Sequence, residues 1–298
     1  MHNYDIIDID GEKTTLVLDD IQYKLITDRR HRTFLKRCRK EKILEEIHAC
    51  GNYRELEALA KKRDLCDTCC FSDVNLYGIK RVLIALVELL YRYPTLRSKL
   101  CYIGTIQSFE EFSARLEKGE KELLCAYNLQ YICTEENAKK LGKYLHKRIR
   151  RLIREWDEHT IAIAMSTRDL FDAILLNRTM YEGYAYLNRM SSSRYDESVG
   201  FHSKGGHHPE STIYHEAGHL LDYLCNFRYN EDFLAYYKKF SVDEIKKKVS
   251  EYAATNAAEF IAECFAEYFI SDSPRHVAKT VGEMLDKAYN DYVHYRSN

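Results

Sequence analysis

The stretch TIYHEAGHLLDYLCN, residues 212–226, carries two histidines four residues apart. Consecutive residues of an α-helix are rotated by about 100°, so His215 and His219 lie about 40° apart on one face, one turn from each other. Ile213, Leu220 and Leu224 supply an apolar face. The pattern predicts a helix that is anchored in the core and presents two imidazoles side by side.

Two neutral imidazoles in this arrangement can bind one zinc ion at about 2 Å. Glu216 is rotated away from their line, so it is poorly placed as a ligand and well placed to hydrogen-bond a water molecule at the metal. Zinc lowers the pKa of such a water towards about 7, and a carboxylate can then take its proton. This is the HExxH arrangement of metallopeptidases. The pattern is short, and a helix with two hydrogen-bonded histidines is the alternative.

Residues around the motif extend this hypothesis. Asp222 falls on the histidine face and is expected to accept the outer ring N–H of a zinc-binding histidine, which would fix its tautomer. Gly218 costs a helix about 0.8–1 kcal/mol relative to alanine, which predicts a close approach by another element, such as a strand beside the metal. Ser211 and Thr212 offer N-terminal caps.

A second apolar stretch, SEYAATNAAEFIAECFAEYFIS at residues 250–271, offers the third ligand that a zinc site needs. Glu259, Glu263 and Glu267 are four residues apart on one stripe of this predicted helix. Carboxylates on so apolar a helix are expensive to bury unless they are paired or bound to metal. One of the three is the natural third ligand, while a solvated outer face is a reasonable alternative for Glu267.

The two stretches together resemble a known family. HEAGHLLD, followed by YAATNAAEFIAECFAEYF, is similar to the zinc metallopeptidase domain of anthrax lethal factor and its relatives, which include toxin-like and phage-associated domains. The resemblance covers about residues 180–285 and is sharp over 212–226 and 252–269. It implies a gluzincin-type α+β fold with a small sheet beside the HExxH helix. It does not extend to the first 70 residues, and the chain is too short to contain the large substrate-recognition domains of lethal factor.

The resemblance also implies roles for single residues. His215, His219 and Glu259 would bind one zinc ion, and Glu216 would be the general base. Tyr252 matches a tyrosine that hydrogen-bonds the developing oxyanion or assists the leaving amine. Glu263 matches a carboxylate that supports the ligands from behind.

The rest of the chain predicts an α+β protein that is predominantly helical, with a small N-terminal region at 1–70 and a helical, zincin-like domain at 71–298. Residues 4–27 alternate apolar and polar and predict a hairpin or small sheet. Helices are expected over about 28–49 and 53–64, and the pattern is helical from 75 to about 156, where one helix ends before Pro94. YAYLNRM, residues 184–190, fits a strand. The loop histidines His202, His207 and His208 could contact substrate, although surface histidines are the commoner explanation.

Composition excludes some functions. The net charge of -1 gives no general case for nucleic acid or membrane, and the basic runs at 29–42 and 147–154 are expected to be solvated helix faces. The run VLIALVELL, residues 82–90, is about half the length of a membrane span. Without a secretory signal, we expect a cytoplasmic protein with reduced cysteines, with signal-independent export or phage association left open. Cys66 and Cys69 form a CxxC pair, which is half a zinc site at best.

These observations favour a zinc-dependent metalloendopeptidase that acts on a protein or peptide substrate. The alternative is a non-catalytic structural or interaction protein that retains the fold. A nucleic-acid-binding protein is a weaker hypothesis. So is a peptide deformylase, which would need Cys225 or Cys264 as its third ligand. No oligomeric state is predicted.

Overall fold

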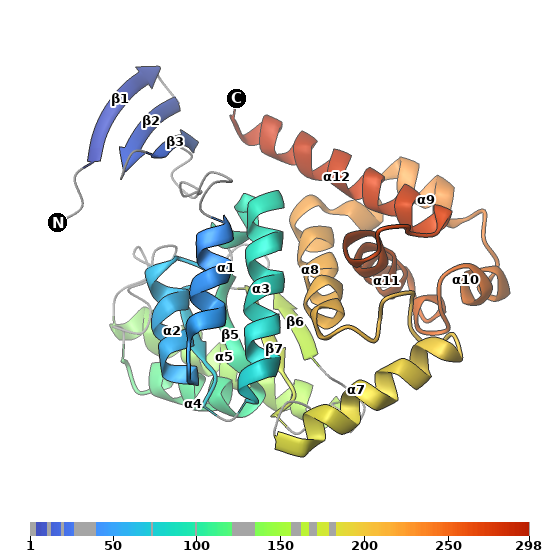
Figure 1. Ribbon diagram of the computed structural model, residues 1–298, viewed down its shortest axis with the longest axis horizontal. Helices are drawn as coiled ribbons and strands as arrows, with labels where there is room; N and C mark the ends of the chain where they lie inside the picture. Colours follow the sequence, from blue (N-terminus) through green and yellow to red (C-terminus); the bar gives the residue numbers. More distant parts are fainter. Residues whose placement is uncertain are drawn as a thin grey trace.

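A four-stranded sheet that is buried on both faces lies near the centre of the protein, as the computed structural model shows (Figure 1). Every residue of β5 (Leu100–Thr105) and β7 (Asp172–Leu176) is buried. Successive side chains of a strand point to opposite faces of the sheet. Accordingly, Ile103 and Ile174 lie in one hydrophobic cluster, whereas Tyr102 lies in a second cluster. Continuous apolar strands of this kind need helices on both sides.

The strand order in this sheet is β4-β5-β7-β6. β4 (Thr68–Cys70) and β7 run parallel to β5, whereas β6 (Ala162–Ser166) pairs antiparallel with β7 and stands at the edge. The register places Ala164 of β6 opposite Ile174. This edge strand is the part of the sheet that lies beside the motif helix.

The structure describes residues 4–10, 13–18, 21–26, 40–72, 74–98, 100–120, 135–155, 162–166, 172–178 and 183–297. The N-terminal strands are β1 (Tyr4–Asp10), β2 (Lys13–Leu18) and β3 (Ile21–Ile26). The helices of the first half are α1 (Lys40–Ala49), α2 (Tyr53–Lys62), α3 (Leu76–Arg92), the 3-10 helix η2 (Pro94–Ser98), α4 (Ile106–Glu117) and α5 (Glu135–Glu155). Those of the second half are α7 (Gly183–Ser198), α8 (Pro209–Cys225), η5 (Phe227–Tyr229), α9 (Glu231–Tyr237), α10 (Val242–Lys248), η6 (Tyr252–Ala254), α11 (Ala257–Ile270) and α12 (His276–Ser297).

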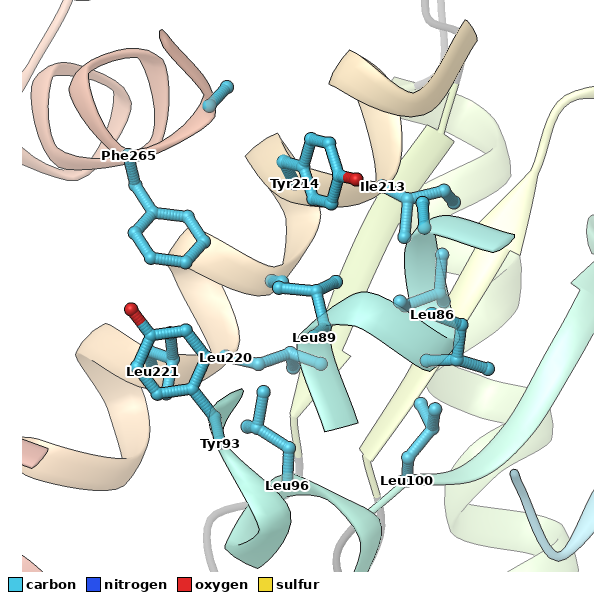
Figure 2. Packing of buried hydrophobic residues seen from close by; sticks show 14 of the residues in the cluster. Leu86, Leu89, Tyr93, Leu96, Leu100, Ile213, Tyr214, Leu220, Leu221 and Phe265 are labelled. Carbon is cyan, nitrogen blue, oxygen red and sulfur yellow. The ribbon is translucent and has the colours of Figure 1, made fainter. Parts of the chain in front are cut away.

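The motif helix α8 lies between α3 and α11 (Figure 1). Figure 2 shows Leu89 of α3 beside Leu220 of α8, and Phe265 of α11 facing Tyr93 at the end of α3, with ring centroids 5.6 Å apart. Fully burying such side chains stabilises the fold by about 1.5–3 kcal/mol each. The site therefore stands on helices that the main core holds in place.

Residues 40–70 belong to the same core. Ile43, Ile47 and Leu56 are buried in the hydrophobic cluster that also contains Phe265, and β4 is a strand of the central sheet. A domain boundary near residue 70 would cut through this cluster and this sheet. The predicted small N-terminal region is thus packed into the main domain from Lys40 onward.

Most of the expected elements are present. Residues 4–26 form a three-stranded antiparallel sheet in the order β1-β2-β3, as the alternating pattern predicted. The helix expected over 28–49 is seen from Lys40, and residues 28–39 lie outside the described residues. α3 ends at Arg92, before Pro94.

The strand predicted for YAYLNRM is wrong, because residues 184–190 belong to helix α7. β propensity is a weak and context-dependent preference, and tyrosines alone do not decide it. The sheet beside the metal motif is instead built from β6 and β7, which lie just upstream of α7 in the sequence.

No helix among the described residues is long and apolar enough to cross a membrane. The apolar run at 82–90 belongs to α3, where Val82, Leu83, Leu86 and Val87 are buried in the main core.

Candidate metal centre

Helix α8 positions the two motif histidines. It begins at Pro209 with His208 as its N-cap, and it ends where Asn226 adopts a left-handed conformation, with φ of 50°. Proline suits the first helical position because no intrahelical partner is needed for its missing N–H. The caps expected at Ser211 and Thr212 are therefore wrong, since the helix starts before both.

Gly218 allows α8 and α11 to cross closely. A Cβ at this position would lie 2.9 Å from Cα of Ala262 and 3.3 Å from Cβ of Phe265, both on α11. The predicted close approach is confirmed, but the neighbour is a helix and not a strand. It brings the stripe of glutamates on α11 against the histidine face of α8.

His215, His219 and Glu259 meet at one point. The Oε2 atom of Glu259 lies 3.0 Å from Nε2 of His215 and 3.3 Å from Nε2 of His219. One nitrogen or oxygen atom from each residue lies within 4.8 Å of the other two. Donor atoms around a tetrahedral zinc ion stand about 3.4 Å apart, given bonds of about 2.0–2.2 Å. Two imidazoles and a carboxylate in this geometry fit zinc and leave a fourth position open.

The charges around His215 favour a cation. Burial opposes the charged imidazole, but hydrogen bonds to Glu259 and Glu263 outweigh it and raise the pKa of His215 well above its usual value. Burial likewise opposes the Glu259 carboxylate, but its hydrogen bonds with His215 and His219 hold its pKa below the ordinary range. A metal ion would take the place of the His215 proton, because a ligating histidine must be neutral.

Glu216 is not part of this group of ligand atoms, as its helical position predicted. Its side chain is buried, and Oε2 accepts a hydrogen bond from the backbone N–H of Ala164 on β6. Burial raises the pKa of Glu216, against the opposing influence of His215 and His219. The carboxylate is thus fixed between the motif helix and the edge strand.

Tyr252 joins the site from the 3-10 helix η6. Its ring centroid lies 5.8 Å from that of His215, with 32° between the ring planes. The family resemblance predicted that Tyr252 belongs to the site, and in the structure its ring lies next to His215.

Glu263 lies behind His215. Its Oε1 is 3.1 Å from Nδ1 of His215, and its Oε2 accepts hydrogen bonds from the backbone N–H of Ser203 and the hydroxyl of Ser250. A carboxylate on the outer nitrogen fixes the tautomer that leaves Nε2 free to bind metal. Burial opposes its charge, but hydrogen bonds from His202 and His215 hold the pKa of Glu263 well below its usual value.

Asp222 does not take the role predicted for it. Its carboxylate accepts hydrogen bonds from the backbone N–H and the guanidinium of Arg228, and the described contacts of His215 run to Glu259 and Glu263 instead. The chain reverses at Asn226, so Arg228 folds back onto the last turn of α8. Asp222 thereby closes the end of the motif helix.

The alternative that Glu267 lies on a solvated outer face is wrong. Its side chain is fully buried and forms an ion pair with Arg275, which donates from both its backbone and its guanidinium. The three glutamates of α11 therefore have different partners: Glu259 contacts Nε2 of His215 and of His219, Glu263 contacts Nδ1 of His215, and Glu267 pairs with Arg275.

His202 was not singled out as a site residue by sequence reasoning, which left all three loop histidines as surface residues or substrate contacts. The structure separates them. His202 reaches Glu263 and Tyr252, whereas His207 pairs with Glu197 and stacks on His208. Ser250 and Ala164 were missed as well, because neither residue type signals a metal site.

Cysteines stand apart from this site in the described part of the chain. Cys66 and Cys69 are buried free thiols in the main core, and the described cluster of potential metal ligands contains only His215, His219 and Glu259. Burial raises the pKa of the Cys264 thiol well above its usual value. These observations disfavour a thiolate as third ligand.

No protein-family model, no curated protein and no solved structure matches this chain.

Proposed function

We propose that this chain is a zinc-dependent metalloendopeptidase with a zincin-like fold of the gluzincin type. The observation that supports it most is that His215 and His219 of α8 meet Glu259 of α11 at one point, beside the buried Glu216. His215 and Glu259 are 44 residues apart in the sequence. The side chains of these three residues are only 12–18% exposed, so the group is sheltered and still reachable from solvent.

In this proposal one zinc ion is held by His215, His219 and Glu259. When bound, zinc activates a water molecule and polarises the peptide carbonyl. The remaining chemistry belongs to the side chains around it.

Glu216 is the general base and then the general acid. It accepts a proton from the attacking water and donates that proton to the nitrogen of the leaving amine as the peptide bond breaks. The raised pKa of the buried carboxylate suits both steps, since proton transfer is most efficient when the pKa lies near the working pH. The hydrogen bond from Ala164 fixes the position of this carboxylate between α8 and β6.

Tyr252 is the electrostatic partner in this scheme. The Tyr252 ring lies beside His215, and in this scheme its phenolic O–H donates a hydrogen bond to the oxygen that gains negative charge in the transition state. Removing one such donor typically costs about 10²–10³-fold in kcat.

The edge strand supports an extended peptide as the substrate. Among the described strands, β6 has β7 on one side only. An exposed strand edge can hydrogen-bond an extended peptide as an additional strand. The N–H of Ala164 is already bonded to Glu216, so a peptide along β6 would pair with the other edge groups of the strand and pass this carboxylate.

The test combines metal content with cleavage. Wild-type protein should bind one zinc ion and cleave members of a peptide library, as measured by elemental analysis and mass spectrometry. Glu259→Ala should lose both properties, whereas Glu251→Ala, a change at an exposed glutamate nearby, should lose neither. Glu216→Gln should keep zinc and lose cleavage. A non-catalytic protein would show no cleavage and no effect of Glu216→Gln in any assay.

A further inference from the structure

The loop that follows α7 is fastened to the site by its backbone. The carbonyl groups of Gly200 and Phe201 accept hydrogen bonds from the N–H groups of Glu251 and Tyr252, at 2.9 and 3.0 Å. The next attachment is the hydrogen bond from the N–H of Ser203 to Glu263, at 2.6 Å. The residue between these attachments, His202, is therefore held at a fixed depth.

His202 is placed between two groups of the proposed catalytic machinery. Its Nδ1 lies 3.4 Å from Oε1 of Glu263, the same oxygen that lies 3.1 Å from Nδ1 of His215. Its ring meets Tyr252 edge to face, with centroids 5.5 Å apart and 68° between the planes. The side chain is 17% exposed.

Three rings pack against Tyr252 and restrict the rotation of its side chain; one of them is His202. Phe201 also packs against the Tyr252 ring at 5.9 Å, and His215 lies against it at 5.8 Å. Aromatic pairs in such geometries contribute about 0.5–1.5 kcal/mol each beyond their buried area. Because Glu263 accepts from Nδ1 of His202, the orientation of the His202 ring is tied to the same buried carboxylate that orients His215.

We propose that His202 is a positioning residue for Tyr252: anchored on Glu263, its ring holds the tyrosine in the orientation that serves the reaction. The role in catalysis rests on the proposed function, whereas the orientation of the tyrosine can be tested without it. His202 itself touches no reacting atom in this scheme.

Two substitutions separate the two contacts of His202. His202→Phe keeps a ring against Tyr252 and removes the hydrogen bond to Glu263. His202→Asn keeps an N–H donor near the position of Nδ1 and removes the ring. His202→Ala removes both, and His208→Ala is the control on the same loop, since the described ring contact of His208 is with His207.

Kinetics on a cleaved library peptide give the first readout. His202→Ala and His202→Asn should lower kcat by about tenfold or more with KM and zinc content unchanged, because a misplacement of about 1 Å can cost about 10²-fold. His202→Phe keeps the ring without its anchor, so its kcat should fall between those of wild type and His202→Ala, and His208→Ala should match wild type. In a Tyr252→Phe background, His202→Ala should cause no further loss. An equal loss in both backgrounds, or a His202→Phe variant as slow as His202→Ala, would overturn the proposal.

A second readout needs no activity. In metal-free protein with 13C-labelled tyrosine rings, the Tyr252 signal is identified by its disappearance in Tyr252→Phe. We expect this signal to shift or broaden in His202→Ala and to stay in place in His208→Ala. If it is unchanged in His202→Ala, His202 does not position the tyrosine. If wild-type protein cleaves nothing while the signal responds as expected, it is the proposed function that fails.

Discussion

Replacing Gly218 with alanine adds a single methyl group where α8 crosses α11. The new Cβ would stand 2.9 Å from Cα of Ala262, which is 0.5 Å short of the 3.4 Å at which ordinary contact begins. That neighbour is backbone and cannot rotate away. The two helices must therefore separate by about 0.5 Å, or bend by an equivalent amount.

Two opposing free energies decide the stability of Gly218→Ala. Alanine improves the intrinsic stability of the helix by about 0.8–1 kcal/mol relative to glycine. Overpacking a well-packed core costs about 1–3 kcal/mol. The net result is a loss of about 1 kcal/mol in the free energy of unfolding. Functional constellations must be held within about 0.5 Å, so displacement of Glu259 from His215 and His219 should weaken zinc binding about tenfold or more.

Urea unfolding of the metal-free protein, followed by circular dichroism, measures the first quantity, and competition with a chelator measures the second. Gly51→Ala is the control, because a Cβ there would meet only Oε2 of Glu55, at 3.7 Å. It should leave zinc affinity unchanged and should not lower stability. If Gly218→Ala is more stable than wild type and binds zinc equally well, the close packing of α8 on α11 is wrong.

Further predictions concern the partners of the buried carboxylates. Glu263→Gln should weaken zinc binding by about 10–100-fold, whereas Asp222→Asn should lower stability and leave zinc affinity unchanged, as isothermal titration would show. Arg275→Ala removes the guanidinium from the buried Glu267 carboxylate and leaves it only the backbone N–H of residue 275, which should cost about 3–5 kcal/mol in urea unfolding, against less than about 1 kcal/mol for Lys279→Ala in an exposed pair. Hydrogen bonding from Arg63 lowers the pKa of Glu46, so the ionised Glu46 carboxylate stabilises the folded protein. This contribution to the free energy of unfolding is fully present above the ordinary glutamate pKa of about 4.3 and is lost as the pH falls through the lower pKa of the folded state. The gap in stability between wild type and Glu46→Gln, at most about 1 kcal/mol because the pair is partly exposed, should therefore shrink between pH 5 and pH 3; a gap that is constant with pH would contradict it.

The shared face of His215 and His219 could be predicted because helical periodicity is local and strong, whereas the choice of Glu259 among the three glutamates came from the family resemblance. A four-residue spacing fixes which side chains share a face, whatever the remainder of the chain does. The same rule placed Asp222 correctly on α8 but could not foresee Arg228, which reaches it only because the backbone turns at Asn226. Likewise, nothing in the apolar stretch of α11 indicated that Arg275 would bury Glu267.

The edge strand and His202 could not be predicted for a different reason. β6 is only five residues long, and its contact with Glu216 joins residues that are 52 positions apart in the sequence. The position of His202 depends on hydrogen bonds between a loop and residues about 50–60 positions later in the chain. For residues 184–190, tyrosine-rich composition suggested a strand where the backbone is helical.

The stripe of glutamates on α11 has a consequence for how this chain tolerates change. Inserting or deleting one residue between Glu259 and Glu263 would turn every later side chain by about 100° relative to the first. Metal binding, the orientation of His215 and the anchoring of Arg275 would then fail together, although no functional residue had been replaced. The length of this helix between the glutamates is therefore fixed.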